Sequence, residues 1–519
     1  MGLGTGQFLA FLLALPYRLF PSDDLSYYQH IVAGGDEFIG LFTHPTTYRY
    51  VHPIYYNYLF LCRQIWRTFA EVSPSVLIFA NLLANTVSLT MIVLTCRRVT
   101  GSVAWASGAG LIFATSAWAT NYYFFFFYAP FPVALILTGF TLLIYGSYRE
   151  TTTPRPMTFM VSGLLLALAF WSSPSAAVSV ALVLAVSPFV CGTQSDGRRH
   201  TLLACIWLAV GFIMVFLPYA FISGPAYLSH ILDNVNSAAY QEAFKKIGYV
   251  LVSPQFSFFR VLFVYSPTEA LLFSILAIVS LFSFFRHRFN SERGLRLCAI
   301  LAALCLTHTL VVDLLPTTKL GRTHFHAYPF VIIFLAVAGH WVLNQQPADR
   351  NRKIIGRVLL FFLALTVVFS IAQILKTRTA RFAVPEFLEK HAHVTNIYLL
   401  GEDPHAVFIS QWLQDPRIEF IDTKTMNRIF WTAAATDRHE LVIIGPTGSD
   451  SGNSILQSAS LPDFVPAIPD RIAERFAYLP YYAYLPNFLF EEETCLALYF
   501  AATNHFPDKL TSGIKILIR

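Results

Sequence analysis

"PSDDLSYY" (residues 21–28) follows an apolar run at residues 3–20 and places two adjacent carboxylates, Asp23 and Asp24, where that run ends. A carboxylate at the edge of a bilayer loses hydration, so it needs a partner or a function. Aspartate is a preferred N-cap residue, so either side chain could begin a helix near Leu25. General-base catalysis and the binding of a divalent cation are the functional alternatives.

The composition of the chain predicts an integral membrane protein. Of the 519 residues, 55% are hydrophobic and 13% are charged, whereas soluble domains average about 25% charged residues. Apolar runs long enough to cross a bilayer predict about eleven transmembrane helices, at residues 3–20, 74–96, 101–120, 124–148, 157–172, 174–191, 201–222, 267–285, 295–313, 327–344 and 354–375. The motif "WSSPS" (171–175) breaks residues 157–191, which leaves a re-entrant pair as an alternative there.

The positions of the basic residues predict the orientation of the chain. Short basic segments follow every second apolar run, at Arg97 and Arg98, Arg149 and Arg155, Arg198 and Arg199, residues 286–296 and residues 349–353. The positive-inside rule makes these loops cytoplasmic, so the N-terminus lies inside and the C-terminus outside. The basic residues behind the net charge of +6 therefore indicate the orientation of the chain in the membrane, and we expect no nucleic-acid partner.

The chain divides into a membrane domain, residues 1–375, and a soluble domain outside the membrane, residues 376–519. The outer loop at 21–73 contains an aromatic and basic stretch, residues 46–69, which is typical of a helix lying on the bilayer surface. After residue 375, strand-like runs at 396–401, 417–422 and 440–445 alternate with helical segments. This alternation predicts a small α/β domain with a parallel sheet.

A second polar cluster lies in "LLPTTKLGRTHFHAYPF" (314–330), on the predicted outer side of the membrane. It contains Lys319, Arg322, His324 and His326. Cations at this depth can bind a phosphate group. Arginine does so through two parallel hydrogen bonds from its guanidinium group, and lysine does so as a point charge. Anchoring to lipid head groups is the alternative, although the positive-inside rule disfavours basic residues on this side.

The order of these parts resembles the GT-C superfamily of polytopic glycosyltransferases. Within it, the chain is similar to the bacterial branch related to protein O-mannosyltransferases and to the lipid A aminoarabinose transferase. The resemblance covers nearly all of residues 1–375. It depends on the acidic pair in "PSDDLSYY", on "HPIYYNYLF" (52–60), and on "KLGRTHFHAYPFVIIFLAVAG" (319–339), which leads into a late helix.

The resemblance implies an inverting transfer of a sugar from a polyprenyl-phosphate donor to an acceptor hydroxyl outside the membrane. Asp23 or Asp24 would be the catalytic base. The donor phosphate would be bound by Lys319, Arg322, His324 and Arg49, and the substrate pocket would include His52, Tyr55, His326 and Glu269. The acceptor could be a protein, a lipid or a polysaccharide, and the protein would reside in a bacterial inner membrane with its C-terminal domain in the periplasm or outside.

Two departures from the family pattern limit this interpretation. The Trp-Trp-Asp signature of oligosaccharyltransferases is missing from the sequence, which disfavours asparagine glycosylation. The next outer loop, residues 121–132, lacks the second acidic residue that the family often has. The metal requirement therefore stays open: Mg²⁺ or Mn²⁺ held by Asp23 and Asp24 is one alternative, and a reaction without metal is the other.

Two other classes of function compete with the transferase. A transporter or a flippase for lipid-linked glycans would use the same lipids, but such proteins usually show paired repeats and ionisable residues inside the spans. We find no convincing repeat, and Asp313 and Glu269 lie only at the ends of predicted helices. A non-catalytic scaffold would leave the outward acids and bases unexplained.

Overall fold

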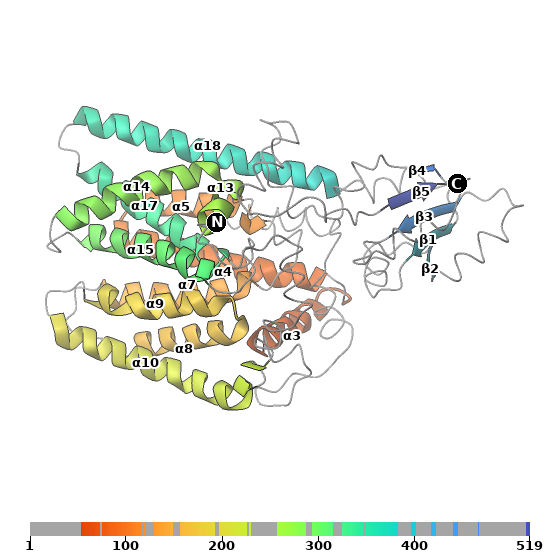
Figure 1. Ribbon diagram of the computed structural model, residues 1–519, viewed down its shortest axis with the longest axis horizontal. Helices are drawn as coiled ribbons and strands as arrows, with labels where there is room; N and C mark the ends of the chain where they lie inside the picture. Colours follow the sequence, from red (N-terminus) through yellow and green to blue (C-terminus); the bar gives the residue numbers. More distant parts are fainter. Residues whose placement is uncertain are drawn as a thin grey trace, which may run out of the picture.

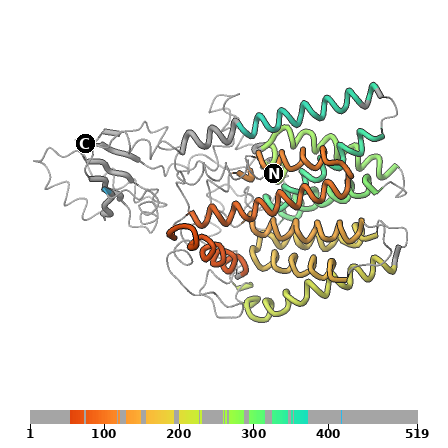
Figure 2. Tube along the Cα trace, turned by 180° about the vertical axis from the view of Figure 1, so that it is seen from behind, coloured from red at the N-terminus to blue at the C-terminus, as the bar shows by residue number. Residues whose placement is uncertain are grey.

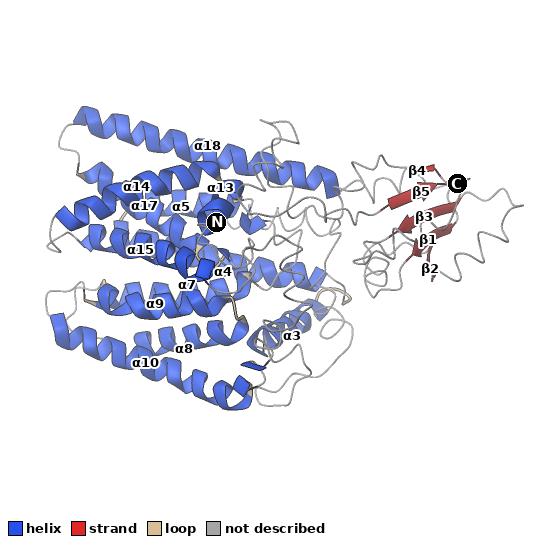
Figure 3. Cartoon of the chain, viewed as in Figure 1, coloured by secondary structure: helices blue, strands red, loops and turns tan. Residues whose placement is uncertain are grey.

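The structure is a computed structural model of the 519-residue chain. It describes residues 53–72, 75–116, 118–120, 129–148, 156–192, 197–225, 228–229, 257–286, 293–314, 324–345, 349–381, 396–400, 417–421, 440–444, 465–466 and 515–518. Within these residues the chain is helical as far as residue 381, and five short strands follow (Figures 1 and 3).

The helices form a bundle of roughly aligned rods, seen from opposite sides in Figures 1 and 2. They are α3 (Pro53–Arg67), α4 (Ser75–Thr100), α5 (Val103–Thr115), α7 (Pro130–Ser147), α8 (Pro156–Ser172), α9 (Ala176–Cys191), α10 (Gly197–Ile222), α13 (Ser257–Tyr265), α14 (Pro267–Arg286), α15 (Arg293–Leu314), α17 (Tyr328–Asn344) and α18 (Asp349–Arg381).

The predicted apolar runs coincide with helices wherever the structure describes them. Each run from 74–96 to 354–375 overlaps one of the helices α4 to α18, and the run at 3–20 lies outside the described residues. Six of these helices, α4, α7, α10, α14, α15 and α18, are long and apolar enough to cross a membrane, and α5, α8, α9 and α17 are shorter apolar helices. The chain is therefore a multi-pass membrane protein, and the total of eleven spans stays a prediction.

The longest helix, α18, is longer than the apolar run at 354–375 that predicts it. It has 33 residues, roughly 50 Å at the rise of an α-helix, whereas a hydrocarbon core is about 30 Å thick. Only 11% of its most apolar window is buried, so α18 lies at the edge of the bundle and presents most of its surface to lipid (Figure 1). The extra length arises because polar residues continue the helix beyond the apolar segment at both ends.

The segment "WSSPS" separates two helices, as predicted. Helix α8 ends at Ser172, and α9 begins at Ala176 and runs back beside it (Figure 1). Helix α10 packs closely on α8. The two backbones are so near that a Cβ added at Gly163 would lie 2.0 Å from the backbone oxygen of Leu208. A Cβ at Gly211 would lie 1.9 Å from the backbone oxygen of Met160. Two glycines thus permit the backbones of these helices to touch.

Helix α3 lies within the surface helix predicted at 46–69, of which residues 46–52 lie outside the described residues. One face is buried in an aromatic cluster with the start of α4, through Tyr55, Tyr56 and Cys62. The other face exposes large apolar side chains, including Leu61 and Ile65. A helix with one face on protein and apolar groups on the other suits a position at the edge of the bilayer.

The two ends of the bundle differ in chemistry. At one end, which we call the basic end, the Arg98 guanidinium donates a hydrogen bond to the backbone oxygen of Tyr148, whose hydroxyl lies 3.5 Å from the backbone oxygen of Arg293. The described arginines and lysines of this end are Arg97, Arg98, Arg199, Arg286, Arg293, Arg296, Arg350, Lys353 and Arg357, whereas α3 has only Arg63 and Arg67 among its described residues. The end is on the left in Figure 1, and α3 lies at the opposite end. This segregation agrees with the predicted alternation of basic loops, and the assignment of the basic end to the cytoplasm stays a prediction.

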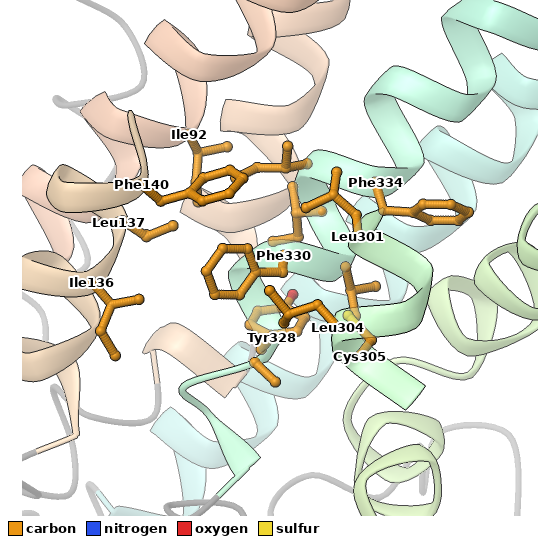
Figure 4. Packing of buried hydrophobic residues seen from close by; sticks show 14 of the residues in the cluster. Ile92, Ile136, Leu137, Phe140, Leu301, Leu304, Cys305, Tyr328, Phe330 and Phe334 are labelled. Atoms are coloured by element: carbon orange, nitrogen blue, oxygen red, sulfur yellow. The ribbon is translucent and has the colours of Figure 1, made fainter. Parts of the chain in front are cut away.

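The core of the bundle is centred on α17. Residues 328–339 of this helix are all buried. Figure 4 shows Phe330 between side chains of α7 and α15, such as Phe140 and Leu304. The Phe334 ring points away from α7, and its centroid is 4.8 Å from that of Phe273 on α14. Because these residues of α17 are buried on every side, α17 forms the central helix of the late half of the chain.

The strands after residue 381 form one sheet in the order β2-β1-β3-β5-β4. They are β1 (Asn396–Leu400), β2 (Ile418–Ile421), β3 (Glu440–Ile444), β4 (Val465–Pro466) and β5 (Lys515–Ile518). Strand β1 pairs in parallel with β2 and β3, at the three predicted positions, and β5 pairs antiparallel with β3 and β4. The helices expected between these strands lie outside the described residues, so the α/β domain as a whole stays a prediction.

Candidate functional site

A buried polar cluster joins three helices at the end of the bundle opposite the basic end. The Tyr328 hydroxyl, at the start of α17, lies 2.8 Å from Ser116 Oγ and 3.2 Å from Glu269 Oε1. Glu269 is in the first turn of α14 and is 1% exposed. A carboxyl group is rarely buried in an apolar bundle unless it has partners, so this cluster marks a candidate functional site.

The Tyr328 hydroxyl is the donor toward both Ser116 Oγ and Glu269 Oε1. It carries one proton, so it donates to one of these two oxygens at a time. The Glu269 carboxyl group also hydrogen-bonds to the side chain of Ser266, the residue just before α14. The carboxyl group is thus held by side chains from its own helix start and from α17.

Local sequence explains why these side chains lie at helix ends. Helix α14 begins with Pro267 and α17 has Pro329 in its first turn, positions where the missing N–H of proline costs no hydrogen bond. Glu269 then lies near a helix N-terminus, where the helix dipole favours a carboxylate. Ser116 ends α5 and accepts a hydrogen bond from the backbone N–H of Ala119 at 3.3 Å, so it begins the next turn.

Three buried histidines lie at the same end of the bundle. His308 on α15 has its Nδ1 atom 3.3 Å from Ser179 Oγ on α9, and its ring centroid is 5.7 Å from that of His324. His326 is also buried and interacts electrostatically with His308. A hydrogen-bonded turn just before α17 carries His324 and His326, so this turn brings both rings into the bundle. The Phe258 ring lies 5.7 Å from His308 and 5.8 Å from His324.

Trp118 connects the histidines to the carboxyl cluster. Its ring centroid is 4.8 Å from that of Tyr328, 5.9 Å from Phe325 and 6.4 Å from Phe258. Aromatic pairs at such distances each contribute roughly 0.5–1.5 kcal/mol beyond the burial of their surface. The rings therefore hold the polar groups in a rigid apolar setting, in which hydrogen bonds and charges act more strongly than in water.

A cavity of about 200 Å³ borders Glu269. Its walls come from α5, α14, α17 and α18, and it also reaches Thr366. The Thr366 hydroxyl is hydrogen-bonded to that of Thr268 at 2.6 Å, which joins α18 to the start of α14. Glu269 is thus part of both the polar cluster and the wall of this cavity.

The structure describes four of the predicted site residues. Glu269, His324 and His326 lie at the same end of the bundle and are buried, as is Tyr55, which packs in the separate cluster of α3. The remaining residues, Asp23, Asp24, Arg49, His52, Lys319 and Arg322, lie outside the described residues. The predicted approach of the acidic pair to Lys319 and Arg322 therefore stays a prediction.

Several residues of this site were not predicted. His308 stands alone in an apolar run, and a single ionisable residue inside a span is a signal that could have identified it. Ser116 and Tyr328 give no such signal, because serine and tyrosine are common near helix ends. Among the described residues, no group of three or more His, Cys, Asp or Glu side chains could hold a metal ion.

Comparison with solved structures identifies the fold. The chain is similar to ArnT from Cupriavidus metallidurans bound to undecaprenyl phosphate, with a TM-score of 0.53 and 11% sequence identity over 89% of this chain and 95% of that one. The apo state of that protein gives a TM-score of 0.49 and 12% identity over 89% of this chain and 94% of that one. The oligosaccharyltransferase of Archaeoglobus fulgidus in the apo form gives a TM-score of 0.42 and 11% identity, over 85% of this chain and 69% of that one.

No protein-family model matches the chain, and no curated protein matches it in sequence at a significant level. The likeness to ArnT nevertheless extends over almost the whole of both chains, from the helical bundle into the C-terminal part. The resemblance predicted from the acidic pair, the surface helix and the late basic stretch is confirmed at the level of the fold. The chain has the fold of the GT-C glycosyltransferases.

Proposed function

We propose that the chain is an inverting glycosyltransferase that moves a sugar from a polyprenyl-phosphate-type donor to an acceptor hydroxyl at the extracytoplasmic face. The observation that carries this proposal is the fold shared with ArnT over 89% of the chain. That structure holds undecaprenyl phosphate, and we extend the donor class to this chain. A buried polar site at the end of the bundle away from the basic residues is consistent with chemistry on the outer side.

In the proposed reaction the acceptor oxygen attacks the anomeric carbon of the sugar from the face opposite the phosphate. A carbon–oxygen bond to the acceptor forms while the bond from that carbon to the donor phosphate breaks, which inverts the configuration. The acceptor proton passes to the carboxylate of Asp23 or Asp24, and the lipid phosphate leaves with the bonding electrons. Phosphate is a good leaving group, so no strong general acid is required.

The donor phosphate is proposed to bind Lys319, Arg322, His324 and Arg49. Positive groups stabilise the charge that builds up on the departing phosphate, and they do so most effectively where water is excluded. His324 is the described member of this set, and it is fully buried at the turn that leads into α17. His52, Tyr55, His326 and Glu269 are proposed to line the substrate pocket. If a divalent cation takes part, Asp23 and Asp24 are its proposed ligands.

Replacing each acidic residue tests the assignment of the base. We expect Asp23→Asn or Asp24→Asn to lower transfer by 10²–10⁴-fold, the usual contribution of a general base. The measurement is mass spectrometry of cell-envelope glycans in a strain without the gene, complemented by each variant at equal membrane abundance. Asp36→Asn, in the same outer loop, is the matched control and should restore the glycan fully.

The outcomes separate the enzyme from its competitor. Loss of the glycan in one aspartate variant, with normal abundance, supports a base at that position. Unchanged glycan in both variants removes the proposed base. Deleting the gene for a transporter or a flippase would also remove the glycan. The purified protein in detergent distinguishes the two classes, because only a transferase moves sugar from a polyprenyl-phosphate donor to an acceptor. Absence of transfer by the purified protein would overturn the proposal.

A further inference from the structure

The two arginines at the start of α15 lie where their own helix disfavours them. Arg293 and Arg296 are in the first turn, where the helix dipole is positive and favours anions, and that turn contains no acidic residue. Their spacing in the helix puts both side chains on one face. The positive-inside rule accounts for basic residues at this end of the bundle, but it does not require two of them on one face of a helix N-terminus. An anion bound there would be stabilised by both arginines and by the dipole.

Tyr148, the residue that follows α7, adds a hydrogen-bond donor to these arginines. Its hydroxyl lies 3.5 Å from the backbone oxygen of Arg293, a distance at which a hydrogen bond is weak. Burial raises the pKa of this hydroxyl, whereas the positive charges of Arg293 and Arg296 lower it, so both guanidinium groups lie near it. Arg98, at the end of α4, donates to the backbone oxygen of Tyr148 and lies over the Tyr145 ring, 5.5 Å from its centroid. Three helices thus hold Tyr148 and the two arginines together.

The face of α15 that carries these arginines continues toward the other end of the bundle as a largely apolar stripe. At intervals of three or four residues after Arg296 it consists of Ile300, which is partly buried, and of the exposed Ala303, Thr307 and Leu310. An exposed stripe of this kind on a membrane helix faces lipid chains. The arginines therefore lie where this lipid-facing surface reaches the level of the head groups.

Helix α9 lies beside α15 and extends the lipid-facing surface (Figure 1). The contact between Ser179 and His308 fixes the register of the two helices. The chain runs equally far from Ser179 to Cys191 and from His308 to Arg296, so the end of α9 lies level with the arginines of α15. The exposed residues of α9 are mostly small, namely Ala181, Ala185, Pro188 and Phe189. An aliphatic chain can lie against such side chains, with the Phe189 ring near its head-group end.

We propose that Arg293, Arg296 and the Tyr148 hydroxyl bind the phosphate of an anionic phospholipid, whose acyl chains lie along α15 and α9. Arginine forms strong charge-assisted hydrogen bonds with phosphate, and basic sites between membrane helices suit anionic head groups. A zwitterionic lipid carries a second, positive group that the arginines would repel.

This lipid is a bound component of the protein and not a substrate. Its site is at the basic end of the bundle, opposite the buried carboxyl cluster and the histidines. The inference therefore does not depend on the proposed function, and a binding measurement can fail while the glycan assay succeeds, or the reverse.

Photo-crosslinking of the full-length protein in detergent tests the choice of lipid. The probe is phosphatidylglycerol with a diazirine in one acyl chain, and we expect it to label peptides of α15 and α9. Unlabelled dioleoylphosphatidylglycerol should displace it at about a tenfold lower concentration than dioleoylphosphatidylcholine. Inorganic phosphate and dioleoylglycerol, which each carry one part of the ligand, should not displace it at that concentration. Equal displacement by the two phospholipids, or displacement by inorganic phosphate, would overturn the proposal.

Two pairs of arginine variants test the location of the site. Arg293→Gln combined with Arg296→Gln should weaken labelling about 30-fold, since each arginine near anionic lipid contributes about fivefold in affinity. Arg199→Gln combined with Arg286→Gln removes the same charge from exposed positions on other helices at this end, and should change labelling by less than about twofold. Arg293→Gln alone, at an exposed position, should lose about fivefold and serves if the double variant does not fold. Equal losses in the two double variants would show that net charge alone attracts the lipid, and would overturn the site.

Discussion

At the scale of single residues, the Tyr328 hydroxyl is the group on which the buried cluster depends. It lies within hydrogen-bond distance of both Ser116 and Glu269, although Ser116 is 212 residues away in sequence. All three side chains are almost completely buried, so no water is expected to replace a lost partner. Removing this one oxygen therefore changes the environment of two other polar groups.

Tyr328→Phe should destabilise the protein by about 1–3 kcal/mol, because it leaves the Glu269 carboxyl and the Ser116 hydroxyl without this partner. Thermal unfolding of the purified protein in detergent measures the effect as a lower Tm. Tyr145→Phe, a partly exposed tyrosine at the basic end, is the control and should change the free energy of unfolding by less than about 0.5 kcal/mol. Equal Tm values for the two variants would show that the cluster contributes nothing to stability.

Cys62 on α3 should be unreactive in the folded protein. It is 1% exposed, and burial raises the pKa of its thiol to about 12, so the thiol stays protonated and neutral at any pH from 7 to 9. Peptide mapping after treatment with a maleimide at pH 8 should find Cys62 unmodified in the native protein and modified after unfolding in SDS. Rapid modification in the native protein would mean that α3 does not pack on α4 as described.

At the scale of helices, the contact between α8 and α10 is controlled by two glycines. Any side chain at Gly163 or Gly211 would collide with the backbone of the partner helix rather than with a movable side chain. The helices would have to move apart, and interiors packed at crystal density transmit such shifts to their neighbours. The close approach also brings Trp171, at the end of α8, against Tyr219 on α10, with ring centroids 6.0 Å apart.

Gly163→Ala and Gly211→Ala should each lower the stability by about 1–3 kcal/mol or more through overpacking. The double variant should cost less than the sum of the two, because both changes separate the same pair of helices. Thermal unfolding and the yield of monodisperse protein in detergent are the measurements. Gly294→Ala is the control, since a Cβ there would lie 3.9 Å from the nearest side chain and alanine favours a helix. A stable Gly163→Ala variant would contradict the described contact.

At the scale of the whole molecule, the separation of charge along the bundle indicates its orientation in the membrane. The described basic residues of α4, α10, α14 and α15, and those at the start of α18, lie at one end. The opposite end has the surface helix α3, the buried carboxyl cluster and the histidines. An extracytoplasmic reaction requires this second end to face outward.

Cysteine labelling in a bacterial host tests the orientation. Phe69→Cys, next to the end of α3, should react with a membrane-impermeant maleimide in intact spheroplasts, because this position is 81% exposed at the end away from the basic residues. Arg199→Cys, at the basic end, should react only after the membrane is permeabilised. Both variants need a background with Cys495→Ser, since residue 495 is in the domain predicted to be outside. The reverse pattern of labelling would invert the topology and exclude an extracytoplasmic site.

The sequence by itself predicted the apolar helices that the structure describes, because hydropathy is a local property that a run of about 20 residues carries without its neighbours. It also predicted the separation at "WSSPS", the surface helix that contains α3, and the strands β1 to β3, since proline, amphipathicity and β-branched residues act over a few positions. Glu269 and His324 were recognised as candidates from their positions near the ends of apolar runs.

The tertiary structure alone decided which distant polar groups meet. Ser116, Glu269 and Tyr328 come from three helices, and their contacts depend on the packing of α5, α14 and α17 around one another. The cavity beside Glu269 is likewise lined by residues from four helices, α5, α14, α17 and α18. Helix pairing is fixed by the fit of side chains across the bundle, and no local pattern in the sequence encodes it.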